Sequence, residues 1–155
     1  MRRPISSFRF LIQLILSIVL LMGVFSCKPA NERSCIKRTG DMDSLEVELP
    51  HFDKLILGEH MKFVLIQDTI EKLRIHGGEN LLNLINISTN TSTSEVIIEN
   101  DNRCRFMRYK TNEIIVYIHF KQINELIFNG SDSLTNEGVL SLNNFKLETL
   151  GAAGS

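Results

Sequence analysis

Cys27 is the residue with the most specific chemistry in this chain, because of what precedes it. Three arginines in the first nine residues are followed by an apolar run, and Val-Phe-Ser comes directly before Cys27. A positive start, an apolar core and small residues before a cysteine are typical of a bacterial lipoprotein signal. We expect cleavage before Cys27 and a lipid anchor on its thiol. An uncleaved membrane anchor is the alternative, although the apolar run falls short of the roughly 20 residues that span a bilayer.

Cys35 and Cys104 are the two remaining cysteines. A secreted chain meets an oxidising compartment, in which these thiols could form a disulfide. Two unrelated thiols are the alternative, since spacing in the sequence does not show proximity in the fold. No CxxC pair or Cys/His cluster indicates zinc.

Three hydroxyl side chains share one local pattern, an Asp before and an apolar residue after the hydroxyl. This pattern looks like the O-glycosylation signal of some Gram-negative extracytoplasmic proteins. It could equally be turn chemistry, in which the aspartate caps the turn. The candidate O-glycosylation sites are Ser44, Thr69 and Ser133.

No constellation in the sequence indicates catalysis or a cofactor. The four histidines, at positions 51, 60, 76 and 119, have no second histidine at helical or strand spacing. Glu99, Asp101 and Asn102 could contribute to a weak calcium site, but they lack the other oxygen ligands of a recognisable loop. No common catalytic or nucleotide-binding motif occurs. We therefore expect no enzyme activity, no cofactor and no metal.

The charge of the mature chain argues against nucleic acid as a partner. The leader holds three of the 17 lysines and arginines and no acidic residue, so 14 basic residues remain against 18 acidic ones, a formal charge of −4. Basic and aromatic residues alternate within 103–110, but four cations on an acidic chain favour a solvated loop.

The chain divides into three parts. Residues 1–27 form the predicted signal, and the polar segment 28–42 has no periodicity and reads as a tether. Alternating apolar residues from position 43 onward predict strands, for example 45–49, 63–66 and 114–120. Two of the expected strands, Leu55–Leu57 and Phe63–Ile66, are joined by a short connection in which Gly58 is expected to supply the turn. The polar run 86–94 indicates a loop or a solvated strand edge. The third part, 43–155, is expected to be one all-β domain.

A weak internal repeat refines the expected fold. A shift of 22 residues aligns Ile118 with Leu140 and Phe128 with Leu150. Short strands that recur with small-residue corners are typical of a β-solenoid, in which each coil stacks on the next.

Five segments share short motifs with a known family: Phe52–Leu55 with Gly58, Phe63–Gln67, Lys72–Gly77 with Asn80, Glu125–Ser131 and Leu147–Ser155. Through them the chain resembles the putative auto-transporter adhesin, head GIN domain family. The resemblance covers Phe52 to Ser155, and it implies a right-handed parallel β-helix on a lipoprotein or secreted chain, with no catalytic residues. Relatives usually continue for several coils, so the last coil is expected to be incomplete at its C-terminal end.

These observations predict a non-enzymatic outer-membrane lipoprotein of the cell envelope, held to the membrane by its lipid. Its solenoid would present a binding surface, adhesin-like, to a glycan or an envelope protein. One alternative is a structural component that stacks on a partner, or on itself, at the C-terminal end. Another is a truncated fragment without function.

Overall fold

The structure is a computed structural model that describes residues 13, 15, 39–102 and 113–150. The chain forms two compact units, Met1–Arg33 and Ser34–Ser155, and all described strands belong to the second. None of the helices within these described residues is both long and apolar enough to cross a membrane.

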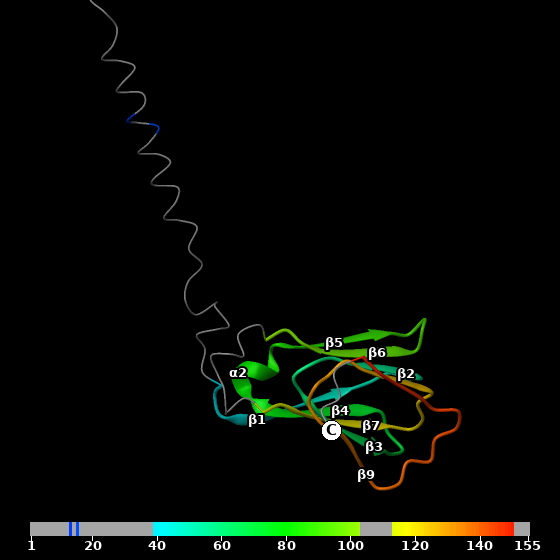
Figure 1. The fold of residues 1–155 in the computed structure, drawn as a ribbon. Coiled ribbons are helices and arrows are strands. Elements are labelled where there is room, and N and C mark those ends of the chain that lie inside the picture. Colours follow the sequence, from blue (N-terminus) through cyan, green and yellow to red (C-terminus); the bar gives the residue numbers. More distant parts are fainter. Residues whose placement is uncertain (1–12, 14, 16–38, 103–112, 151–155) are drawn as a thin grey trace, which may run out of the picture. The chain divides into compact units, whose positions relative to one another are not determined.

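In the described part of the chain, ten strands form two five-stranded sheets, which lie as two layers (Figure 1). We call them sheet A and sheet B. In spatial order, sheet A consists of β1 (Met42–Glu48), β4 (Lys72–Gly78), β7 (Ile115–Phe120), β3 (Lys62–Gln67) and β9 (Leu134–Glu137). Sheet B consists of β10 (Lys146–Thr149), β8 (Glu125–Phe128), β2 (Lys54–Leu57), β6 (Glu95–Asn100) and β5 (Ile85–Asn90). A short helix, α2 (Glu79–Leu82), follows β4.

The core lies between the two sheets and follows from the alternation of each strand. In β7, for example, Val116, Ile118 and Phe120 are fully buried, while the residues between them are half-buried. Successive side chains of a strand point to opposite faces, so one face of each sheet is apolar. The apolar faces meet, and rings from both sheets touch in the core: Phe63 of β3 and Phe128 of β8 pack edge to face.

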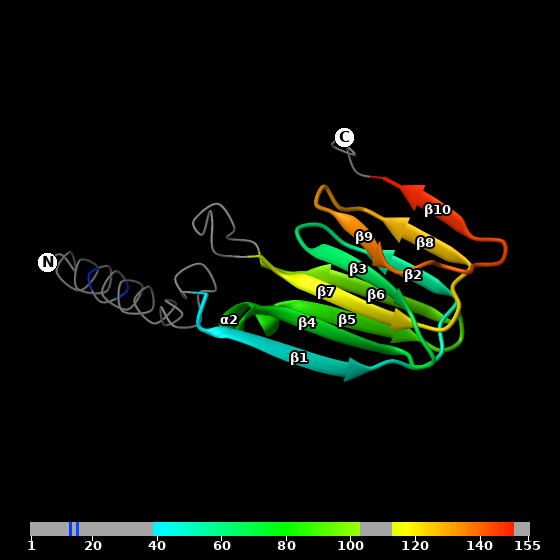
Figure 2. The same cartoon turned by 90° about the horizontal axis from the view of Figure 1, so that it is seen from below.

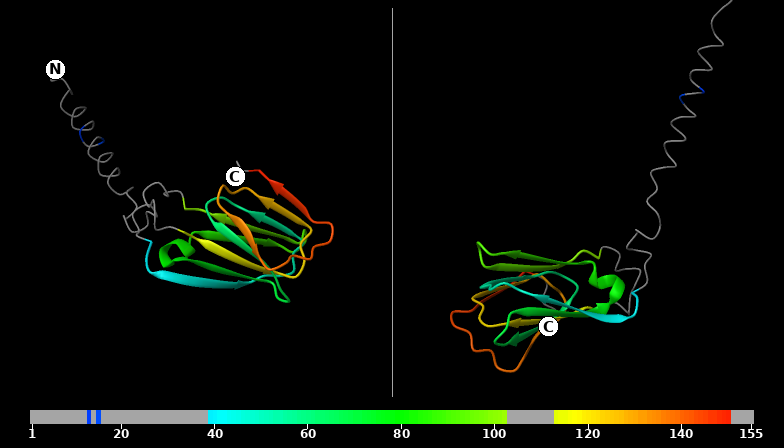
Figure 3. Two further views of the ribbon diagram at one scale, coloured as in Figure 1. Left: turned by 60° about the horizontal axis from the view of Figure 1, so that its bottom comes forward. Right: turned by 180° about the vertical axis from the view of Figure 1, so that it is seen from behind.

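Parallel strands stack in the same order in both sheets. Three segments, β2–β3, β6–β7 and β8–β9, each pass from sheet B to sheet A. The segment β2–β3 comes first in the sequence but lies between the other two in space. In sheet B, β2 pairs with β6 and β8, and in sheet A, β3 pairs with β7 and β9. Figure 2 shows β9 and β10 together at one end of the stack and β1 toward the other. Two further views show the same layers (Figure 3).

The all-β expectation is confirmed, but a right-handed parallel β-helix is not. Both sheets are mixed, because β1 and β4 pair antiparallel, β4 runs antiparallel to β7, and β5 runs antiparallel to β6. The physical reason is that the turns at 68–71 and 91–94 reverse the chain within one sheet. A parallel β-helix needs each strand to be followed by a corner that leads into the next sheet. The two sheets are also not closed into a tube.

The connection between β2 and β3 differs from the expected one. The two strands belong to different sheets and do not pair. His60, with φ of 68°, adopts the left-handed conformation that was expected of a glycine. Gly58 instead lies against β6, where an added Cβ would come within 3.0 Å of the Ile98 carbonyl oxygen. This corner therefore requires glycine because it leaves no room for a side chain, and not because the backbone needs a left-handed conformation.

The polar run 86–94, expected to be a loop or a strand edge, begins as a strand. Residues 86–90 belong to β5, an edge strand of sheet B, and only 91–94 form the turn.

The internal repeat differs from the expected one by one residue. Leu147 pairs with Leu126 and Thr149 with Phe128, so β10 and β8 are related by 21 residues and not 22. A one-residue change of register exchanges the two faces of a strand.

Candidate functional site

Polar side chains gather on the outer face of sheet A. In β4, Leu73 and Ile75 point into the core, so Lys72 and Arg74 point to the outer face. Cross-strand pairing then places Glu46 of β1 opposite Arg74. The polar face is therefore a product of three antiparallel strands, β1, β4 and β7, that the sequence keeps far apart.

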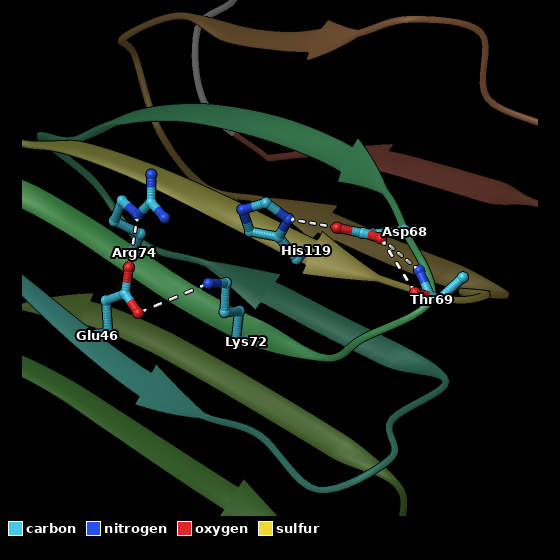
Figure 4. A network of polar contacts seen from close by, with 6 residues as sticks. All are labelled: Glu46, Asp68, Thr69, Lys72, Arg74 and His119. Carbon is cyan, nitrogen blue, oxygen red and sulfur yellow. Dashed lines mark hydrogen bonds and ion pairs between the residues drawn. The ribbon is translucent and has the colours of Figure 1, made fainter.

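Glu46 contacts two cations of the neighbouring strand (Figure 4). Its Oε1 lies 2.7 Å from Arg74 Nε, and its Oε2 lies 3.6 Å from Lys72 Nζ. The hydrogen bond from Arg74, followed by the charge of Lys72, holds the pKa of Glu46 below its ordinary value. This carboxylate stays ionised at neutral pH and fixes both cations on the face.

A second polar contact joins the end of β3 to β7 on the same face. Asp68 accepts a 2.6 Å hydrogen bond from the backbone N–H of Thr69, and its other oxygen lies 3.1 Å from His119 Nδ1 (Figure 4). The Thr69 hydrogen bond, then the His119 contact, lowers the pKa of Asp68. The carboxylate closes the turn from β3 to β4, which forms one wall of the groove described next.

A groove of about 590 Å³ runs beside this network, and we call it the sheet A groove. The end of β1, the turn 68–71, the start of β4 and one residue after β7 form its walls. Its lining residues are Glu46, Val47, Glu48, Leu49, Thr69, Ile70, Glu71, Lys72 and Lys121.

Glu71 is the most enclosed charge of the sheet A groove. Only 6% of its side chain is exposed, and it accepts a 2.7 Å hydrogen bond from His51 Nδ1, with Lys121 Nζ at 3.7 Å. Ile70 beside it is 45% exposed. The groove thus combines fixed carboxylates, two ammonium groups and an apolar side chain open to solvent. Such a set suits a ligand with many hydroxyls on one side and C–H groups on the other.

A smaller hollow of about 350 Å³ gathers the residues considered for calcium. Glu99, Asp101 and Asn102 line it together with Asn129. The backbone N–H of Asn102 donates to Asn100 Oδ1 at 2.9 Å, which is the hydrogen bond of a turn. Within the described residues, no three His, Cys, Asp or Glu side chains are grouped in a way that could hold a metal ion.

The residues predicted from the sequence fall into two groups. Cys27, Cys35 and Cys104 lie outside the described residues. The three hydroxyl sites are exposed and belong to the strands or turns of sheet A: Ser44 in β1, Thr69 in the turn before β4, and Ser133 before β9. Asp43 and Asp68 each accept a hydrogen bond from the next residue's N–H. Only Asp68 lies in a turn, because Asp43 and Ser44 belong to β1. Thr69 is the only one of the three that lines the sheet A groove.

Three of the four histidines contact a carboxylate in the structure. His51 contacts Glu71, His60 contacts Glu59, and His119 contacts Asp68. Two of these contacts join residues 20 and 51 positions apart. Three further residues of the polar face were not predicted either, because cross-strand neighbours leave no signal in local spacing. They are Glu46, Glu71 and Arg74.

Two mixed five-stranded sheets with an apolar core between them define a two-layer all-β domain, and a polar groove lies beside sheet A. Residues 51–154 match the putative auto-transporter adhesin, head GIN domain family, and the chain belongs to that family. The resemblance seen in the sequence is confirmed.

Solved structures share the fold at low sequence identity. A putative adhesin from Bacteroides fragilis NCTC 9343 matches with a TM-score of 0.62 and 18% identity, over 72% of this chain and 51% of that chain. A putative adhesin from Parabacteroides merdae ATCC 43184 matches with a TM-score of 0.58 and 15% identity, over 71% and 44%.

A third structure, of a putative lipid binding protein from Parabacteroides distasonis ATCC 8503, matches with a TM-score of 0.54 and 15% identity, over 71% and 46%. The chain spans about half the length of these solved relatives. No curated protein matches the sequence.

Proposed function

We propose that this protein is a non-enzymatic, adhesin-like domain of the cell envelope that binds a glycan through the sheet A groove. The family and the adhesins among the similar structures support an adhesin-like role. The observation that carries the ligand class is the lining of the groove. Glu48 and Glu71 can accept hydrogen bonds from sugar hydroxyls, Lys72 and Lys121 can donate them, and Ile70 can cover the C–H face of a ring.

A glycan array followed by calorimetry with the best glycan tests this proposal. Glu48→Gln and Lys72→Met, which change exposed or half-exposed groups of the groove, should each weaken binding about tenfold or more, since each removes a charge-assisted hydrogen bond. Lys54→Met on the outer face of sheet B is the matched control and should bind as the unaltered protein does.

Two results would overturn the glycan proposal. One is an array without any binder. The other is a glycan whose affinity is unchanged by both groove variants, which would place its site elsewhere. Capture of an envelope protein that is lost in Glu48→Gln would show instead that the groove serves a protein ligand.

We further propose that Cys27 becomes the lipidated N-terminus of an outer-membrane lipoprotein. The leader supports this: a positive start, an apolar run and Val-Phe-Ser before the cysteine. Metabolic labelling with a fatty acid should mark the native protein and not Cys27→Ser. Cell fractionation then reports the membrane, and protease treatment of intact cells reports its face.

The remaining covalent proposals are tested by intact mass. A Cys35–Cys104 disulfide would lower the mass by two hydrogens relative to the reduced protein, and a mixture of free thiols would exclude it. Glycosylation at Ser44, Thr69 or Ser133 would add sugar masses that disappear in the corresponding alanine variants. A mass equal to peptide plus lipid would exclude glycosylation.

A further inference from the structure

The outer edge of β10 combines an exposed apolar side chain with two charged ones. Among the described residues, no strand pairs with this edge of sheet B. Leu147 is 52% exposed although its partner in β8, Leu126, is 1% exposed, so Leu147 lies on the core face of the sheet and remains half uncovered. An exposed apolar residue on a free edge favours pairing with another strand.

The backbone of β10 presents hydrogen-bonding groups to that edge at known positions. Lys146 donates its N–H to the Asn124 carbonyl at 2.8 Å, and Leu150 donates to the Phe128 carbonyl at 3.0 Å. Backbone groups alternate along a strand, so those of Leu147 and Thr149 point away from β8. A strand added at this edge must therefore exchange hydrogen bonds with Leu147 and Thr149.

A row of alternating charges crosses sheet B and ends at the same edge. Lys54 Nζ lies 3.3 Å from Glu95 and 3.5 Å from Glu125, and Glu125 lies 2.8 Å from Lys146 Nζ. These residues are in register on four parallel strands, and Glu148 of β10 lies 3.2 Å from Lys146. The edge thus offers one cation and one anion, two residues apart, on the outer face.

We propose that a second copy of this chain pairs with β10 in antiparallel fashion about a two-fold axis at Leu147. Leu147 would then lie opposite Leu147 of the partner subunit and exchange both backbone hydrogen bonds with it. Lys146 would lie opposite Glu148 of the partner subunit, and Glu148 opposite the partner subunit's Lys146. The two leucines cover each other on the core face, and the row of alternating charges continues into the partner.

The sequence of β10 selects this register over its neighbours. Pairing Leu147 with Thr149 of the partner subunit would satisfy the backbone but would place Glu148 opposite the partner's Glu148, and like charges directly opposite are unfavourable. Pairing Thr149 with the partner's Thr149 would lose both ion pairs. Of these three registers, only the one centred on Leu147 pairs opposite charges, brings the two leucines into contact and satisfies the backbone hydrogen bonds.

Charge reversal tests the proposal because the interface is self-complementary. The protein from residue 28 onward contains the whole described core and should show a concentration-dependent dimer in sedimentation velocity. Lys146→Glu places two carboxylates opposite each other, and Glu148→Lys places two ammonium groups opposite each other. Each variant alone should raise the dissociation constant about tenfold or more.

Mixing the two variants gives the decisive result. In a mixed dimer, the Lys146→Glu copy carries carboxylates at both positions of the ion pairs, and the Glu148→Lys copy carries ammonium groups at both. Every cross-strand pair then joins opposite charges, so the equimolar mixture should dimerise again.

Two further variants separate the edge from the rest of the surface. Glu59→Lys, which changes an exposed charge of the β2–β3 corner, is the matched control and should dimerise as the unaltered protein does. Leu147→Thr should weaken the dimer without a change in circular dichroism, because it removes the apolar contact on the core face and keeps the backbone of the strand.

Three results would overturn the proposal. The first is a monomer at all concentrations. The second is a dimer that both charge reversals leave intact. The third is a mixture of the two variants that stays monomeric while each variant is folded by circular dichroism.

Discussion

Phe63 of sheet A and Phe128 of sheet B pack edge to face, with ring centroids 6.1 Å apart and ring planes at 86°. Phe63 is fully buried, and Phe128 is 9% exposed. The contact is a direct link between the two layers, made by strands that belong to neighbouring segments of the stack. Its geometry is the one that aromatic quadrupoles favour.

Removal of either ring is expected to destabilise the domain strongly. Phe63→Ala should lower the free energy of unfolding by about 3–5 kcal/mol, since it removes a buried ring and leaves a cavity. Urea denaturation measures this loss. In a double-mutant cycle with Phe63→Leu and Phe128→Leu, the coupling energy should be about 0.5–1.5 kcal/mol. A coupling energy of zero would mean that the two rings stabilise the fold only through burial.

Gly58 is expected to tolerate no side chain. Gly58→Ala would place a Cβ 3.0 Å from the Ile98 carbonyl oxygen and 3.2 Å from Glu99 Cα, both of them backbone atoms. Because β6 would have to move, the free energy of unfolding should fall by about 1–3 kcal/mol. Glu59→Ala, a change in the exposed residue next to it, should alter it by less than about 0.5 kcal/mol. Equal urea midpoints for the two variants would contradict the close approach.

The positive charge of Lys54 is expected to affect the thermal stability of the domain. It lies between Glu95 and Glu125, and its hydrogen bond to Glu95 contributes most to raising its pKa. Lys54→Met should change the thermal midpoint little, because ion pairs on the solvent-facing side of a sheet contribute little. Lys54→Glu would align three carboxylates across neighbouring strands and should lower the midpoint clearly. The lowering should shrink at high salt, and a salt-independent loss would contradict an electrostatic cause.

Asp68 is expected to make stability fall in acid. Its pKa lies below the ordinary value of 3.8 in the folded protein, chiefly because it accepts the Thr69 hydrogen bond. A lowered folded-state pKa contributes stability that is complete above pH 3.8 and is lost as the pH falls through the folded value. Asp68→Asn should therefore be less stable than the unaltered protein at neutral pH, and this difference should narrow below pH 3.8. Urea midpoints across this range measure it, and a constant difference would exclude the linkage.

Local patterns predicted most of the strands but few of their partners. The alternation of β7 correctly assigned Val116, Ile118 and Phe120 to the core and Tyr117 to the other face. The same kind of pattern in β2 and β3 could not show that they belong to different sheets. Period two reports which face of a strand is buried, and it contains no information about the neighbouring strand.

The candidate site shows the same division. Thr69 was singled out from its own sequence neighbours, and the structure places it on the wall of the sheet A groove. Glu46 and Arg74, 28 residues apart, were not singled out, because their contact depends on the register of β1 against β4. That register is a property of the folded sheet.

The sequence by itself determined the family, the all-β class and the apolar face of the clearly alternating strands, because these follow from motifs and from residue type at alternate positions. Only the tertiary structure decided the mixed sheets, the middle place of β2–β3 in the stack and the side chains that meet in the sheet A groove. These features depend on contacts between residues far apart in the chain, and such contacts are fixed by the packing of the whole core rather than by any local stretch.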